Sequence, residues 1–253
     1  TGLYVRGGGA DENLYLLDGN PVYHVNHLLG FFSAFNPDAI KNTRFYKGSF
    51  PAEYGGRLSS VVDVRMNDGN RQEYHGNISV GLLSARANLE GPIVKDRSSF
   101  NVSVRRTWLD LITGTALAIV NKNSDTKESF GYHFFDINAK VNHSFSERSR
   151  AYLSFYMGQD AFRQGSKEKH EDSDDMFLWR WGNLIGSAGW NYVFGQKLFG
   201  NLMVGYSRFR SHIRQEAKGY EIEGNRAERQ SIKRDSRYKS EMEDLSVRLS
   251  VDY

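Results

Sequence analysis

The 253-residue sequence contains no cysteine and only four prolines, and its charges almost cancel. Without cysteine, disulfide bridges and cysteine-based zinc or redox sites are excluded. The 33 basic residues outnumber the 30 acidic ones by three, which gives a net charge of +3. An excess this small, with both signs interleaved, does not indicate a nucleic-acid-binding surface. We therefore expect no nucleic-acid partner.

The sequence also lacks a long apolar run. A membrane-spanning helix needs about 20 consecutive apolar residues, and only runs of a few residues occur here, so a helical membrane protein is excluded. The chain has 16 Phe, 14 Tyr and 4 Trp, too many for a disordered, solvated chain. With 25 glycines in addition, the composition favours a protein built of many strands.

The first 70 residues differ in pattern from the rest. Short apolar runs at 14–17 and 61–64 predict small buried strands bounded by turn residues, and the apolar residues between 27 and 40 predict a short helix. We expect a compact mixed α/β segment. The turn residues are Pro21, Pro37, Pro51, Gly7-Gly8-Gly9, Asp18-Gly19 and Gly55-Gly56.

From about residue 72 the apolar residues recur with a period of two, which predicts strands. Many of these runs are longer than the usual globular strand of about 5 or 6 residues and match a tilted membrane-crossing strand. One apolar row contains Ile137 and Val141, and the alternate polar row contains Asn138 and Lys140. We expect eight strands, at 74–82, 84–91, 98–108, 131–145, 149–162, 178–194, 199–214 and 240–253.

The connections between these strands alternate in length. Short turns are expected near 91–92, 145–149 and 195–198, and long polar loops at 109–130, 163–177 and 215–239. Aromatic residues gather near the strand ends. This combination is typical of an outer-membrane barrel, with tight periplasmic turns, long external loops and aromatic girdles. We therefore expect the apolar rows to face lipid and the polar rows to face the lumen.

Several ordered motifs in residues 2–68 carry a family resemblance. They are Val5-Arg6-Gly7, Leu17-Asp18-Gly19, Ile40 to Gly48, and Tyr54-Gly55-Gly56 followed by Ser60 to Val64. Together they resemble the second half of the plug domain of TonB-dependent outer-membrane transporters. Lys47 stands where the family commonly has Arg, and Gly56 is an extra residue. The wording AEYGGRLSSVVDV looks most like transporters of the Bacteroidetes type.

The resemblance implies a mixed α/β plug segment at 1–70, followed at 71–253 by antiparallel transmembrane β-barrel strands, about eight of the family's 22. The chain would then be a segment of a longer polypeptide. The implied function is TonB-dependent import of a nutrient (glycan, siderophore, cobalamin or peptide) across the bacterial outer membrane. Implied partners are TonB, membrane lipid and a surface lipoprotein. The alternative is a barrel that serves as a structural or docking subunit without transport.

The resemblance also implies roles for individual residues. The plug loops 8–13 and 23–27 would be exposed and would contact substrate, unless they merely pack against barrel loops. Two basic residues, Arg6 and Lys47, would lock the plug to acidic partners on strands beyond Tyr253. The expected substrate contacts are Asp11, Glu12, Tyr23, His24, Asn26 and His27.

No enzymatic activity, cofactor or metal is expected. His24 and His27 lack acidic neighbours at metal-ligand spacing. The acidic stretch 168–175 lacks the ordered spacing of a calcium loop and indicates a solvated loop. No Ser-His-Asp order or paired-carboxylate frame stands out.

Overall fold

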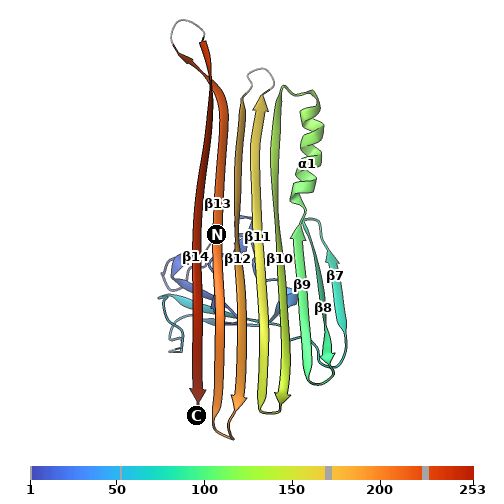
Figure 1. Cartoon of the computed structure of the whole chain (residues 1–253), viewed down its shortest axis with the longest axis vertical. Coiled ribbons are helices and arrows are strands. Elements are labelled where there is room, and N and C mark those ends of the chain that lie inside the picture. The colour runs from blue at the N-terminus through green and yellow to red at the C-terminus, as the bar shows by residue number, and fades with distance from the viewer. Residues whose placement is uncertain (1, 52, 169–172, 224–227) are drawn as a thin grey trace.

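The computed structural model describes residues 2–51, 53–168, 173–223 and 228–253. The chain forms an N-terminal segment (residues 2–70) and one sheet of eight antiparallel strands (the long sheet, β7–β14), and the N-terminal segment crosses one face of this sheet (Figure 1). None of the described helices is long and apolar enough to cross a membrane.

The N-terminal segment contains a four-stranded sheet in the order β2-β1-β6-β5. In it β1 and β6 are parallel, and the other two pairs are antiparallel. A separate short hairpin joins β3 and β4. The elements are η1 (Ala10–Glu12), β1 (Asn13–Leu17), β2 (Asn20–Pro21), β3 (Asn26–His27), η2 (Leu28–Gly30), β4 (Phe32–Ser33), η3 (Pro37–Ala39), β5 (Ile40–Tyr46) and β6 (Ser60–Met66).

Asp18 and Gly19 form the two-residue turn between β1 and β2. Their φ angles are 45° and 87°, the left-handed conformation that a tight hairpin requires and that Asp-Gly adopts readily. The turn brings Leu17 opposite Asn20. Leu17 then packs with Val64 and Met66 of β6 and with Tyr156 of the long sheet, so the core of the N-terminal segment is completed by the long sheet.

The short helix expected within residues 27–40 is wrong. This stretch forms β3, η2, β4 and η3, with no α-helix. Asn36 caps η3 by accepting a hydrogen bond from the Asp38 backbone, and Pro37 follows at the first helical position. Leu28 and Phe32 pack on the long sheet instead of forming one face of a helix, and Phe32 lies 5.4 Å from Phe134, centroid to centroid. Phe31 is 84 % exposed.

The long sheet has the strand order β14-β13-β12-β11-β10-β9-β8-β7, so every strand pairs with its neighbour in sequence. Five of its strands have 20 to 25 residues. The elements are β7 (His75–Val80), β8 (Ser84–Val94), β9 (Ser98–Thr107), α1 (Leu109–Val120), η4 (Asn121–Asn123), β10 (Thr126–Ser146), β11 (Ser149–Glu168), β12 (Asp174–Val193), β13 (Phe199–Glu223) and β14 (Glu228–Asp252).

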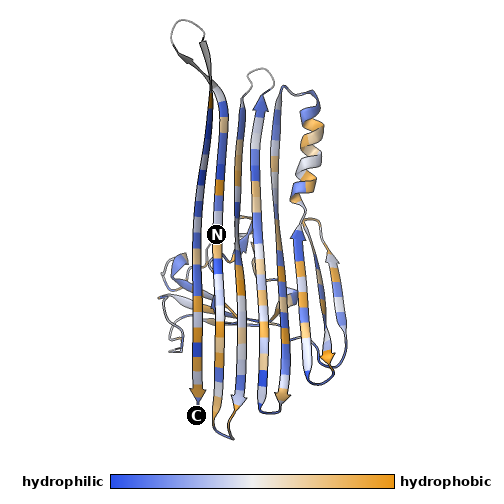
Figure 2. Cartoon of the chain, in the orientation of Figure 1, coloured by the Kyte–Doolittle hydropathy of each residue, from blue (hydrophilic) through white to orange (hydrophobic). Residues whose placement is uncertain are grey.

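The two faces of the long sheet differ in polarity, and hydrophobic and hydrophilic residues alternate along its strands (Figure 2). On the inward face, which the N-terminal segment covers, Asn138, Lys140 and Ser154 are buried. On the outward face Leu153 is 63 % exposed and Val247 is 69 % exposed. The alternation expected from the sequence is thus present, with the polar row toward the N-terminal segment.

The long connections differ from expectation. The expected loop at 109–130 begins with the helix α1, which follows from the apolar run Leu109–Val120. The expected loops at 163–177 and 215–239 are mostly strand, because β11, β12, β13 and β14 extend into them. Residues 169–172 and 224–227, including Glu171 and Asp172 of the acidic stretch, lie outside the described residues.

The expected fold class is confirmed: a small mixed segment precedes eight antiparallel strands. The connections between strands lie at two ends of the long sheet. The turn end holds the connections 95–97, 147–148 and 194–198, and the loop end is where β9, β11 and β13 end and β10, β12 and β14 begin.

Gly69 tests the junction between the N-terminal segment and the long sheet. Its φ is +79°, and an added Cβ would lie 2.1 Å from the Phe100 carbonyl oxygen. We expect Gly69→Ala to lower the free energy of unfolding by about 1–3 kcal/mol, through strain and overpacking. Gly55→Ala is the matched control, because no atom lies within 4 Å of its added Cβ. Urea unfolding of the full-length protein measures both, and equal stabilities would contradict the close approach of Gly69 to β9.

Candidate functional site

Two clusters of buried charges join the N-terminal segment to the inward face of the long sheet. The first is centred on Lys140 of β10, which is 5 % exposed. Its Nζ lies 3.3 Å from Asp18 Oδ1 and 3.2 Å from Asp68 Oδ1, and it donates to the Met66 carbonyl at 3.1 Å. One ammonium therefore contacts the β1–β2 turn, the end of β6 and the link to β7.

Asp68 is the most heavily paired acid in this cluster. It contacts Lys41 at 2.7 Å, Arg150 at 3.0 Å and Lys140 at 3.2 Å. Burial acts to raise the pKa of Asp68, but these three cations outweigh it and lower the pKa to about 2. Asp68 is therefore ionised at neutral pH. Its backbone carbonyl also accepts hydrogen bonds from Ser99 and Asn142 of the long sheet.

The second cluster is centred on Arg105 of β9. Its guanidinium donates to Asp136 Oδ2 from Nε at 2.9 Å and from Nη2 at 2.7 Å. Nη2 also donates to the Ser33 carbonyl at 2.7 Å. His27 enters the same cluster, with Nδ1 2.7 Å from Asp160 Oδ2 and Nε2 3.5 Å from Asp136 Oδ2. The cluster thus ties β3 and β4 to three strands of the long sheet.

His27 is expected on an exposed loop from the sequence, and the structure contradicts this expectation. It is 3 % exposed and stacks on Phe134 with ring centroids 4.1 Å apart. Burial lowers its pKa, but the hydrogen bonds and charges of Asp136 and Asp160 outweigh burial, so the pKa of His27 is raised. The His27 ring lies between the carboxylates of Asp136 and Asp160, and direct contact with a ligand would require His27 to leave this position.

Tyr23, His24 and Asn26 are partly exposed. The His24 ring lies 6.0 Å from the rings of Trp181 and Phe209, and its carbonyl accepts a hydrogen bond from Asn183 at 2.7 Å. Burial lowers the pKa of His24. Asn26 instead lines a groove within the N-terminal segment, together with Val25 and other residues. The expected loop 23–27 therefore presents its side chains to three different surroundings.

Asp11 and Glu12 lie in η1, which precedes β1. Glu12 accepts a hydrogen bond from the Gly9 backbone at 2.9 Å, so its carboxylate closes the turn at the start of the helix. Asp11 is exposed. The recorded hydrogen bonds of η1 stay within residues 3–60, whereas those of His24 and His27 reach the long sheet.

Arg6 lies close to the stretch of chain that contains Lys47, and both side chains are exposed. The Arg6 guanidinium lies beside Gly48: an added Cβ at Gly48 would be 2.7 Å from Nη1. Lys47 Nζ lies 5.7 Å from the centre of the Phe45 ring. In the described part of the chain neither residue has a recorded ion pair with the long sheet, and their expected role as a lock remains a prediction. Among the described strands, the Lys140 and Arg105 clusters connect the N-terminal segment to the long sheet. No local sequence motif predicts these clusters.

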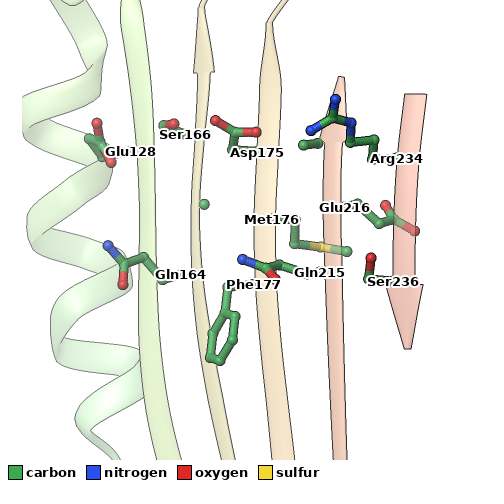
Figure 3. A pocket seen from close by; sticks show the side chains of 12 residues that line it. Glu128, Gln164, Ser166, Asp175, Met176, Phe177, Gln215, Glu216, Arg234 and Ser236 are labelled. Carbon is green, nitrogen blue, oxygen red and sulfur yellow. The ribbon is translucent and has the colours of Figure 1, made fainter. Parts of the chain in front are cut away.

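A cavity of about 800 Å³ opens at the loop end, where the strands β10–β14 extend beyond the N-terminal segment (Figure 1), and Figure 3 shows the side chains that line it. Most of its side chains belong to the inward face. They supply two carboxylates, two amides, two hydroxyls, a guanidinium and an aromatic ring: Glu128, Asp175, Gln164, Gln215, Ser166, Ser236, Arg234 and Phe177. A volume of this size is typical of a binding site for a small molecule.

Aromatic rings continue from this cavity toward His24. Phe177 lies 6.0 Å from Phe162, and the Trp179 and Trp181 rings lie 4.1 Å apart, next along the same inward row of β12. Trp181 is 6.0 Å from His24. Trp181 Nε1 is buried and has no hydrogen-bond partner among the described residues. The row offers stacking surfaces for a ligand that travels from the cavity to the N-terminal segment.

Within the described ranges, no group of three or more His, Asp or Glu side chains is arranged to hold a metal ion.

The Lys140 cluster makes a direct prediction. Lys140→Met leaves Asp18, which is 1 % exposed, without its cation, and we expect a loss of about 3–5 kcal/mol in unfolding free energy. Lys41→Met removes a lysine that also binds Asp68 but is 52 % exposed, and its expected cost is about 0–1 kcal/mol. Urea unfolding of both variants measures the difference. A cost for Lys41→Met as large as that for Lys140→Met would refute the buried cluster.

The raised pKa of His27 predicts a pH dependence. A group whose folded pKa is raised contributes fully below its unfolded pKa, about 6.5, and the contribution is lost as pH rises through the folded value. We expect stability to fall above pH 6.5 in the wild type and to fall less in His27→Gln. His75→Gln, at a side chain that is 53 % exposed, is the control and should retain the wild-type slope. Urea midpoints between pH 6 and 9 measure the slopes, and parallel curves for all three proteins would contradict the prediction.

Comparison with solved structures gives weak similarities to two transporters and a receptor. The ferric citrate transporter FecA in its unliganded form is 8 % identical, with a TM-score of 0.48, and the match covers 96 % of this chain and 45 % of that one. The siderophore receptor PirA from Acinetobacter baumannii is 15 % identical, with a TM-score of 0.43 and coverages of 97 % and 47 %. The transporter YddB from Escherichia coli is 9 % identical, with a TM-score of 0.43 and coverages of 97 % and 47 %. Similarities at this level carry no functional argument.

The chain spans about half the length of these structures. No curated protein matches it. A family match covers the start of the chain, residues 1–62, and the matching family is described as TonB-dependent Receptor Plug Domain. The N-terminal segment, which the two charge clusters hold on the long sheet, is therefore similar to the plug domain of TonB-dependent receptors.

Proposed function

We propose that the protein is a TonB-dependent importer of the bacterial outer membrane, in which the N-terminal segment is the plug and the long sheet is part of the barrel wall. The observation that carries the proposal is the contact between the N-terminal segment and the long sheet. Residues 1–62 match a plug-domain family, and they contact the polar face of a sheet whose opposite face exposes apolar residues. A gate needs such a contact, because it must fill the lumen and still be able to separate from the wall.

The polarity of the long sheet supports a membrane location. Lipid-facing and lumen-facing residues alternate in barrel strands, with apolar residues outward. Leu245, Leu249 and Val251 are 60–78 % exposed on the outward face, whereas the alternate residues contact the N-terminal segment or line the inward face. An apolar face this large is unfavourable in water, and lipid would cover it.

The loop-end cavity is the proposed entry site for substrate. Its amides, hydroxyls and carboxylates offer hydrogen bonds to a polar ligand, and Phe177 begins the row of rings that ends at His24. Neutral hydrogen bonds and stacking each contribute modestly, which suits a ligand that must be released. His24 adjoins the last ring of this row and is the first proposed plug contact, and Tyr23, Asp11, Glu12 and Asn26 are further proposed contacts.

The finer features belong to the same proposal. We infer a transporter of the Bacteroidetes type, of which this chain is a segment, with Arg6 and Lys47 paired to acids outside it. TonB supplies the energy, because the outer membrane holds no ATP or ion gradient of its own. A surface lipoprotein is the proposed further partner, and the substrate is a glycan, siderophore, cobalamin or peptide.

A disulfide tether tests the gating step. The Asn36 side chain donates to the Ser103 hydroxyl at 2.7 Å across the interface between plug and wall, and the described chain contains no cysteine that could form another disulfide. We expect Asn36→Cys/Ser103→Cys to block import when oxidised and to restore it on reduction. Cells with and without the gene receive a defined mixture of the four substrate classes. Mass spectrometry of the medium then measures how much of each solute the cells remove.

The single variants Asn36→Cys and Ser103→Cys are the controls, and both should import normally under oxidation. A docking subunit without transport would give no solute difference between cells with and without the gene. Import that continues unchanged in the oxidised double variant, with the disulfide confirmed, would refute plug movement as the gate.

A further inference from the structure

The outward face of β12 and β13 carries a group of basic residues near the loop end. Strand pairing places Arg180 opposite His212, Gly182 opposite Arg210, and Leu184 opposite Arg208. The alternate residues Trp181 and Asn183 are buried on the inward face. The guanidinium groups therefore lie on the opposite side of the sheet from the N-terminal segment and from the loop-end cavity.

These residues surround a cavity of about 340 Å³, to which Met157 and Gln159 of β11 also contribute. Gly182 supplies no side chain between Arg180 and Arg210, so the basic groups border an open depression. His212 adds a buried Nε2 atom that has no hydrogen-bond partner in the described part of the chain. The cavity is thus lined by guanidinium groups and a histidine ring at its loop-end side.

The charges around this depression do not cancel. Arg208 lies 4.0 Å from Glu241, and Arg210 is also paired with Glu241, so one carboxylate serves two guanidinium groups. Arg180 is exposed, and among the described residues no ion pair is recorded for it. Glu243 lies opposite Arg208 in the register of β13 and β14 and accepts a hydrogen bond from Tyr206. Three arginines against two acids leave a net positive site that complements an anion. Arginine forks match the oxygens of a phosphate.

The outward face directly below is apolar. Phe155, Val204 and Leu153 are 39 %, 40 % and 63 % exposed. Trp190, near the turn end, is ten residues from Arg180 along β12. At about 3.3 Å per residue and a tilt near 40°, this separation corresponds to a height of about 25 Å. An apolar band in a barrel has about this height, so Arg180 would lie at one lipid–water boundary.

We propose that Arg180, Arg208, Arg210 and His212 bind the phosphate of a phosphorylated membrane lipid, whose acyl chains lie along the apolar residues below. The inference rests on the proposed function, because this face meets lipid only where the long sheet spans a membrane. A free phosphate would use the arginines but not the adjoining apolar surface. The combination of net positive charge and apolar surface therefore selects an anionic amphiphile.

Lipid retention by the full-length protein in a neutral detergent tests the site. The probes are phosphatidic acid, diacylglycerol with the same acyl chains, and inorganic phosphate, and native mass spectrometry counts bound molecules. We expect retention of phosphatidic acid over diacylglycerol, with a loss of about tenfold in Arg180→Gln/Arg210→Gln, which corresponds to about 1.4 kcal/mol. Arg148→Gln/Lys197→Gln removes the same charge at the turn end and should retain the lipid as the wild type does.

The preference of the wild type for phosphatidic acid over diacylglycerol is measured without any variant, so it tests the site even if the double variant fails to fold. Arg180→Lys/Arg210→Lys keeps the charge without the fork and should retain an intermediate amount. Equal retention of phosphatidic acid and diacylglycerol, or displacement of phosphatidic acid by equimolar inorganic phosphate, would overturn the lipid site. Insertion into vesicles distinguishes failure of the lipid site from failure of the proposed function. If the protein inserts but shows no lipid preference, only the lipid site is refuted. If it does not insert, the proposed function and the lipid site are both refuted.

Discussion

The burial of charge between the N-terminal segment and the long sheet is the constraint on which the rest of the structure depends. Lys140, Arg105, Asp136 and Asp160 are each less than a tenth exposed. Removing one partner of a buried pair leaves an uncompensated charge that costs several kcal/mol. The segment and the sheet therefore fit in one register, in which Asp18 reaches Lys140 and the remaining contacts follow from that position.

The same constraint explains the polarity of the strands. Because the inward face must pair with buried polar groups of the N-terminal segment, it carries Asn, Ser, Asp, Lys and Arg where a soluble two-layer protein would carry aliphatic residues. The strand period of two then leaves the other face free to be apolar. Toward the loop end the inward row becomes aromatic and then polar, at Trp181, Phe177 and Gln164, while the outward row becomes basic at Arg180 and Arg210. One set of strands thus supplies two chemically separate surfaces.

Much of the fold could be predicted from the sequence, because it is encoded locally. Period-two alternation predicted eight strands, and Asp18-Gly19 predicted a turn. The helix α1 was missed because its apolar run lies where a loop was expected, and the strand extensions were missed because polar residues on both faces hide the period. The candidate site could be predicted only in part. His24 was expected on an exposed loop, and its place beside Trp181 and Phe209 of the long sheet was not predicted. The burial of His27 depends on Asp136 and Asp160, more than 100 residues away, and no spacing rule connects them.

The two kinds of contact across the interface differ in what movement would cost. Neutral pairs such as Asn36 with Ser103, or Ser207 with the Pro21 carbonyl, exchange one hydrogen bond for another when water enters, so their net loss is small. The charge clusters lose far more, because their partners are ionised and nearly dry. In the proposed importer, the energy delivered to the plug would therefore be spent mainly at the Lys140 and Arg105 clusters. These clusters lie on neighbouring strands, β9 and β10, so hydration of this one strip of wall would release most of the resistance while the rest of the plug stays folded.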